Sequence, residues 1–97
     1  MNVHETVQLL SERMPEIRRR FGVRELAIFG SVARNEARPD SDVDVLVEFA
    51  ERPTFDNYMG LKLHLEELFA AGVDLAIRSD LRPGLRPRIE QEAVHVP

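Results

Sequence analysis

The sequence predicts a small α/β domain in which a mixed β-sheet is packed with helices. Short apolar runs alternate along the chain with longer segments of helical periodicity, in the order helix, strand, helix, strand, helix, strand, helix. The length of 97 residues suits one domain over residues 1–97, and 43% hydrophobic residues suffice for a small core. Such alternation places helices on one or both faces of a sheet.

The first predicted helix runs roughly from Glu5 to Arg20. Gly22 follows it and suits the position just after a helix end, where a left-handed residue is common. The apolar residues of this segment recur at steps of three and four, which is the spacing of one helix face. They are Val7, Leu10, Met14, Ile17 and Phe21.

Two strands and a short helix are predicted next. Val23 to Phe29 is the first strand, Gly30-Ser31 is a turn, and Val32 to Asn35 begins a helix too short to be a core element. Val43 to Phe49 is the second strand. Its two faces are both largely apolar until its end, which is typical of a strand in the middle of a sheet.

The rest of the chain repeats the alternation. A third helix starts near Pro53 and ends near Ala71-Gly72, and Val73 to Ile77 forms a third strand. After a loop, Leu85 to Glu92 is a last helix and Ala93 to Val96 is extended. The buried stripe predicted for the third helix comprises Phe55, Tyr58, Leu61, Leu65 and Leu68.

Composition excludes several classes of function. The chain has no cysteine, so disulfides and thiolate metal sites are excluded. No apolar run approaches the length of a membrane span, and the N-terminus lacks the apolar core of a signal peptide, so a soluble cytoplasmic protein is expected. The net charge of −4 argues against stable binding to long nucleic acid, which usually requires a basic protein.

Three carboxylates form the candidate metal site. Asp42 and Asp44 lie two residues apart beside the second strand, so they share one face at a separation of about 7 Å. Asp74 is the second residue of the third strand. If these strands are neighbours, the three like charges converge at one sheet edge and destabilise it, unless a cation lies between them. Mg²⁺ or Mn²⁺ suits such oxygen ligands.

The turn before the short helix suggests a partner for that metal. A helix N-terminus at Ser31 offers backbone N–H groups and a hydroxyl to phosphates, and bound Mg²⁺ usually keeps positions for waters and phosphates. The carboxylates and this turn together predict a nucleoside-triphosphate site. In such a site two metals, roughly 3.5–4 Å apart, would activate an attacking oxygen and stabilise the leaving pyrophosphate. Arg34 lies one turn later. It either faces the phosphates or pairs with Glu36 or Asp40.

These residues match a known signature. Gly30-Ser31, ten residues and then Asp42-Val43-Asp44 follow the order and spacing of the DNA polymerase β-like nucleotidyltransferase superfamily. The fuller segment GSVARNEARPDSDVDVLVEF resembles the minimal nucleotidyltransferase (MNT) proteins. These are typically encoded beside an all-helical HEPN-domain ribonuclease toxin, for which they act as antitoxin. The resemblance covers nearly the whole chain.

The resemblance implies a polymerase β-like nucleotidyltransferase fold and a role for each site residue. Asp42 and Asp44 would hold the metals, and Asp74 would complete the triad and help to deprotonate the accepting hydroxyl. Ser31 would contact the triphosphate, with Gly30 and Arg34 in the same nucleotide-binding set. The implied activity transfers AMP from ATP to a hydroxyl, expected on a tyrosine, of a HEPN toxin.

Two other functions remain open from the sequence. The protein would neutralise the toxin by covering its active site, with the triad vestigial, or it would modify a small hydroxyl compound such as an aminoglycoside. A chain of 97 residues leaves little surface for a small-molecule pocket. We therefore expect the acceptor to come from a protein partner, bound at the outer face of the third helix around Lys62 and Glu66 or at Arg82 to Arg88.

Overall fold

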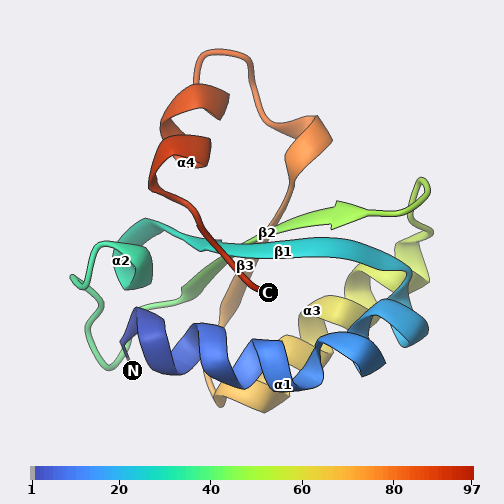
Figure 1. Ribbon diagram of the computed structural model, residues 1–97, viewed down its shortest axis with the longest axis horizontal. Helices are drawn as coiled ribbons and strands as arrows, with labels where there is room; N and C mark the ends of the chain where they lie inside the picture. The colour runs from blue at the N-terminus through green and yellow to red at the C-terminus, as the bar shows by residue number, and fades with distance from the viewer. Residues whose placement is uncertain (1) are drawn as a thin grey trace.

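The computed structural model describes residues 2–97 and shows a layered α/β fold (Figure 1). Helices α1 (Val3–Phe21) and α3 (Phe55–Phe69) cover one face of the sheet, while α4 (Arg86–Glu92) lies on the other side. The predicted fold class is thereby confirmed. Among residues 2–97, no helix has the length and apolar character needed to cross a membrane.

The sheet has four strands in the order β3-β2-β1-β4. Strand β1 (Val23–Phe29) is antiparallel to β2 (Val43–Phe49), and β3 (Val73–Ile77) is parallel to β2. The sheet is therefore mixed, and β2 occupies a middle position, as its apolar faces predicted. The terminal extended piece is strand β4 (Val94–His95), which pairs antiparallel with β1 and gives the chain end a partner that the sequence did not indicate.

The start of α1 differs from the sequence prediction by two residues. Asn2 caps the helix, since its side chain accepts a hydrogen bond of 2.8 Å from the backbone N–H of Glu5. A side chain of this kind satisfies one of the free N–H groups of the first turn. Gly22 ends the helix with a φ of 69°, as predicted.

Two predicted boundaries near the sheet are corrected. Helix α2 (Gly30–Ala33) begins directly at Gly30, so the predicted turn and the short helix are one element. The segment after β3 is not entirely loop, because a 3-10 turn, η1 (Arg78–Asp80), follows the strand. Both elements are too short to leave a periodicity in the sequence.

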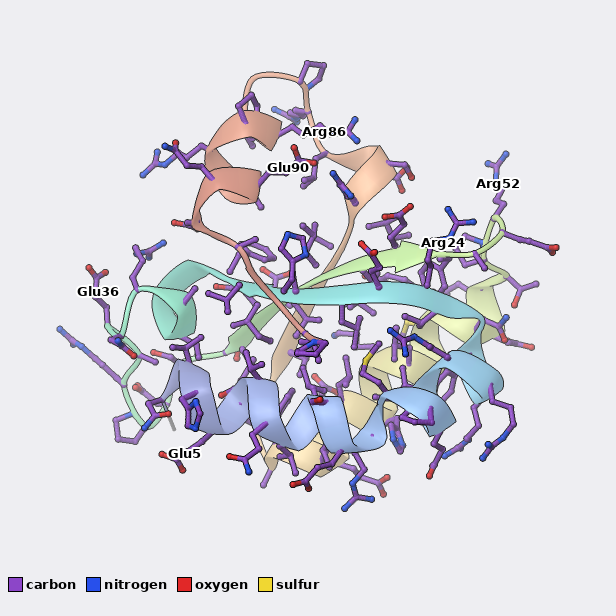
Figure 2. All side chains as sticks on the ribbon, viewed as in Figure 1. Glu5, Arg24, Glu36, Arg52, Arg86 and Glu90 are labelled. Atoms are coloured by element: carbon purple, nitrogen blue, oxygen red, sulfur yellow. The ribbon has the colours of Figure 1, made fainter. Side chains whose placement is uncertain are left out.

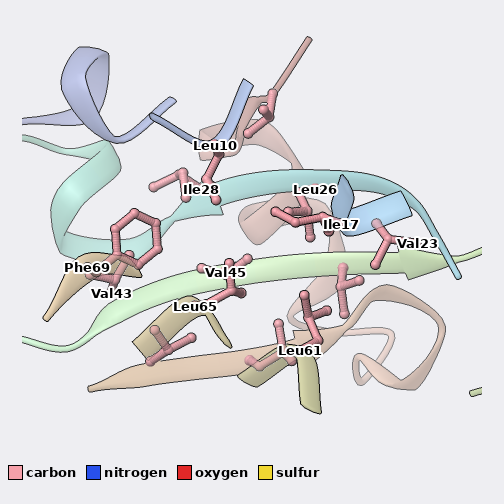
Figure 3. Packing of buried hydrophobic residues seen from close by; sticks show 14 of the residues in the cluster. Leu10, Ile17, Val23, Leu26, Ile28, Val43, Val45, Leu61, Leu65 and Phe69 are labelled. Carbon is pink, nitrogen blue, oxygen red and sulfur yellow. The ribbon is translucent and has the colours of Figure 1, made fainter. Parts of the chain in front are cut away.

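The core lies between the sheet and the pair α1 and α3 (Figure 3). The predicted helix stripes supply Leu10, Ile17, Leu61 and Leu65, all with no exposed surface. Phe55 was predicted in the same stripe and is an exception: it is the first residue of α3 and is 77% exposed. Tyr58 is partly buried against this core, and its hydroxyl donates a hydrogen bond of 2.6 Å to the carbonyl of Leu75. This contact agrees with the prediction that the tyrosine belongs to the core.

Charged side chains hold α4 over the second face of the sheet. Arg78 donates to Glu90 at 2.7 Å and to Glu48 at 3.2 Å, and Arg86 donates to Glu90 at 3.3 Å. Figure 2 shows Arg86 and Glu90 together on this side of the molecule. The hydrogen bond from Arg78, followed by that from Arg86, lowers the pKa of Glu90.

Candidate active site

The three predicted carboxylates lie at one edge of the sheet. Strands β2 and β3 are parallel neighbours, and Asp44 is the direct partner of Asp74 across them. The backbone N–H of Val43 donates to the carbonyl of Gly72 at 2.9 Å, which aligns Asp42 with the residue just before β3. Because side chains alternate along a strand, the carboxylates lie on the face opposite the buried Val43 and Val45.

Asp44 is the most buried of the three carboxylates. Burial raises the pKa of its carboxyl, and the charge of Asp74 and then that of Asp42 raise it further. A hydrogen bond from the backbone N–H of Ser31 opposes this shift. Asp42 and Asp74 are exposed, so they are open to a substrate approaching from solvent. The carboxylates thus repel one another through space, as the sequence predicted.

The carboxylates do not form a closed metal cage. Within residues 2–97, no group of three His, Cys, Asp or Glu side chains is arranged so that it could hold a metal ion by itself. The three acids therefore share one sheet edge, as expected, but do not complete a metal site by themselves. Mg²⁺ in nucleotide enzymes is commonly bound by one or two carboxylates together with water and substrate phosphates. The donor chemistry at this edge fits a metal that is shared with a triphosphate, and it does not fit a site made of protein ligands alone.

Two glycines make room for these acids. Gly30 has a φ of 69°, and a Cβ there would overlap Oδ2 of Asp44 and lie 2.8 Å from its Cγ. Gly72 faces Asp42 in the same manner, because a Cβ would overlap Oδ1 and lie 3.2 Å from Cγ. Sequence reasoning identified Gly30 but treated Gly72 only as a helix end. No sequence signal indicates its second role, which follows from the pairing of β2 with β3.

Arg34 is held by two carboxylates. Its Nε donates to Glu36 at 3.1 Å and its Nη1 to Glu92 at 3.2 Å. Pairing with Glu36 was one of the predicted alternatives, whereas the contact with Glu92 was missed. Among residues 2–97 no ion pair joins Arg34 to Asp40. The same Glu92 carboxylate accepts a hydrogen bond of 3.0 Å from the backbone N–H of Gly30, which is the main reason that its pKa is lowered.

A well-defined cleft lies elsewhere on the molecule. It has a volume of about 810 Å³ and lies where β2 and β3 end, between Phe49, Ile77, Arg52 and Arg78. The carboxylates lie where these strands begin, and none of them lines this cleft. Because Asp42 and Asp74 are exposed at the start of these strands, the candidate active site is an open sheet edge.

Comparison with known proteins agrees with this arrangement. The family model described as "Nucleotidyltransferase domain" matches residues 10–96, which include every predicted site residue. The protein adenylyltransferase MntA of Thermococcus cleftensis is 41% identical over 96 residues, covering 99% of this chain and 97% of that protein. The solved structure of a candidate minimal nucleotidyltransferase is 40% identical, with a TM-score of 0.80 over 97% of this chain and 95% of the other.

A more distant structure shares the fold. It contains a tri-AMPylated HEPN toxin of Shewanella oneidensis in complex with an MNT antitoxin. The matched chain is 17% identical, with a TM-score of 0.66 over 93% of this chain and 71% of the other, so the likeness concerns the fold alone. With the family model matched over most of the chain and relatives at 40% identity, the protein belongs to the nucleotidyltransferase domain family, in the group of minimal nucleotidyltransferases.

Proposed function

We propose that this protein is an antitoxin that transfers AMP from ATP to a hydroxyl, expected on a tyrosine, of a HEPN-domain toxin and thereby neutralises it. One observation carries the proposal. Asp44 and Asp74 are direct partners in the sheet beside the Gly30 turn, with Asp42 on the same face, in a chain 41% identical to a protein adenylyltransferase. The distant relative of the same fold, whose toxin partner is AMPylated, supports it.

The proposed roles follow from exposure and position. Asp42 and Asp44 would hold Mg²⁺ or Mn²⁺ together with ATP, and the metal would offset the negative charge of the phosphates. Ser31 would donate its hydroxyl to the triphosphate, and Arg34 would add a positive charge. Since Asp74 is exposed, an acceptor brought by another protein can reach it.

The chemical step is one displacement at phosphorus. The acceptor oxygen forms a bond to the α-phosphorus of ATP, and the bond from this phosphorus to the oxygen that bridges to the β-phosphorus breaks. Pyrophosphate leaves with the electron pair of that bond. The proton of the acceptor hydroxyl passes to the carboxylate of Asp74, which acts as the general base.

The open edge supports an acceptor carried by a protein. Small-molecule sites are usually concave and enclose most of their ligand, and none of the four best-defined clefts among residues 2–97 is lined by the three carboxylates. An aminoglycoside-type acceptor is therefore the weaker alternative. A protein partner brings its own surface and needs no pocket in this chain.

The predicted contact surfaces differ in how much of them is free. Lys62 and Glu66 pair with each other at 3.8 Å, and Glu66 also accepts a hydrogen bond from the backbone of Val73, so this part of α3 is engaged internally. The segment from Arg82 to Arg88 is exposed, including Leu85 at 50%, and among residues 2–97 Arg86 is the one arginine of this segment that forms an ion pair, with Glu90 at 3.3 Å. We therefore favour this basic segment, whose charge would speed encounter with an acidic partner surface.

Neutralisation by coverage alone remains the second candidate, and one titration separates the two. If transfer is the mechanism, a small amount of this protein with ATP and Mg²⁺ silences an excess of toxin. The intact mass of the toxin then rises by one or more adenylyl groups, and the double variant Asp42→Asn/Asp44→Asn fails. If coverage is the mechanism, silencing needs equimolar protein, ignores ATP and survives the double substitution. An unchanged toxin mass would refute the transfer proposal.

A further inference from the structure

The carboxylate of Glu92 connects the C-terminal helix to the nucleotide turn. Glu92 ends α4 and lies 62 positions from Gly30 in the sequence, yet its Oε1 accepts a hydrogen bond of 3.0 Å from the backbone N–H of Gly30. Its two oxygens also accept from Nη1 of Arg34, at 3.3 and 3.2 Å. The side chain is 24% exposed, so these bonds are partly shielded from water. One carboxylate therefore contacts two of the three residues expected to bind nucleotide.

The turn is held from both sides. Strand β1 has β2 on one flank, where Phe29 is the direct partner of Asp44, and β4 on the other flank, directly after the segment that carries Glu92. The backbone N–H of Ser31 is bonded to Asp44, and that of Gly30 is bonded to Glu92. Glu92 thus lies behind the turn, on the flank away from the three carboxylates.

The same contact orients Arg34. The guanidinium uses Nε for Glu36 and Nη1 for Glu92, and among residues 2–97 no hydrogen bond to a protein group uses Nη2. A long side chain that is already oriented loses less entropy when it binds a phosphate. The pairing therefore leaves Nη2 available in a defined direction.

We propose that Glu92 is a positioning residue for nucleotide binding, which acts by holding the peptide of Gly30 and the guanidinium of Arg34 in place. The inference rests on the proposed function, since it takes this turn to be where the phosphates of ATP bind. Glu92 itself touches no substrate. Its effect passes through the two groups that it holds.

The test measures the affinity of the full chain for ATP with Mg²⁺ by calorimetry. Glu92→Gln keeps an acceptor for the N–H of Gly30 but removes the charge that orients Arg34, so ATP affinity falls about five-fold. Glu16→Gln is the matched control, because it also removes a carboxylate that pairs with an arginine, Arg20 at 3.1 Å, and Glu16 lies on α1, outside the helix that carries Glu92. Its ATP affinity stays at the wild-type value.

Arg34→Gln completes the test and does not depend on the folding of the Glu92 variant, since Arg34 is 45% exposed. Arg34→Gln weakens ATP binding at least as much as Glu92→Gln. In the double variant the fold-loss of ATP affinity is smaller than the product of the two single losses, because both substitutions act through one guanidinium. In the transfer assay Glu92→Gln raises KM for ATP and leaves kcat within about two-fold, the signature of lost binding.

Contrary results separate the two proposals. Wild-type affinity in Glu92→Gln, or in Arg34→Gln, overturns the positioning role, and tighter binding in Glu92→Gln does so too, because the carboxylate would then compete with phosphate. A wild-type protein that binds no ATP refutes the proposed function. If the wild-type protein binds ATP and transfers AMP as proposed, but the Glu92→Gln substitution changes neither, only the present inference is refuted.

Discussion

Comparing Gly30→Ala with Gly22→Ala separates the effect of backbone strain on stability from the effect of a displaced Asp44 on the site. Gly30 and Gly22 both have a φ of 69°, so alanine at either position costs about 1 kcal/mol or more of folding stability from the left-handed conformation. They differ in their surroundings. A Cβ at Gly22 meets nothing within 4 Å, whereas a Cβ at Gly30 overlaps Oδ2 of Asp44.

The displacement can be estimated from the structure. The new Cβ would lie 2.8 Å from Cγ of Asp44, while ordinary contact begins at 3.4 Å, so the carboxylate must rotate away. The backbone of Asp44 is paired with both neighbouring strands and cannot follow. A misplacement on the order of 1 Å in a catalytic group costs about 10²-fold in rate.

The assay compares Gly30→Ala with Gly22→Ala in two measurements. Urea unfolding reports stability, which we expect to fall in both variants. AMP transfer to the partner protein reports the site, and we expect a loss of about 10²-fold in Gly30→Ala and less than two-fold in Gly22→Ala. Equal transfer rates in the two variants would refute the reasoning, because the contact with Asp44 would then have no consequence.

Further predictions concern the acids and a helix cap. Asp44→Asn without divalent metal should be more stable than wild type at pH 7 by urea unfolding. The raised pKa of Asp44 means that its ionisation costs stability as pH rises above the usual value of 3.8, so the difference should disappear near pH 3. Gly72→Ala should displace Asp42, because the new Cβ would lie 3.2 Å from its Cγ, and should slow transfer while a melting curve shows a folded protein. A folded Gly72→Ala with full activity would remove Asp42 from the site. Thr54→Ala should lower stability by about 1 kcal/mol through loss of the cap of α3 and leave transfer unchanged.

Local pattern was sufficient to predict most of the fold. The helix stripes that include Leu10 and Leu61 were predicted from spacing because helical periodicity is a property of neighbouring residues. Strand β2 was assigned to the middle of the sheet from its apolar faces, and the structure confirms it. The acids of the candidate site were predicted in the same way, since their spacing from the Gly30 turn is a local property of the sequence, and the structure places Asp44 directly beside Asp74.

Only the tertiary structure revealed the contacts that bring distant segments together. Glu92 reaches Gly30 across 62 positions, Gly72 leaves room for Asp42, and the two-residue β4 pairs with β1. None of these contacts has a period or a motif, because each depends on which strands become neighbours and not on the residues beside it in the chain. The sequence alone therefore predicted the acids of the candidate site, because their spacing is local, and the order of the strands decided which side chains surround them.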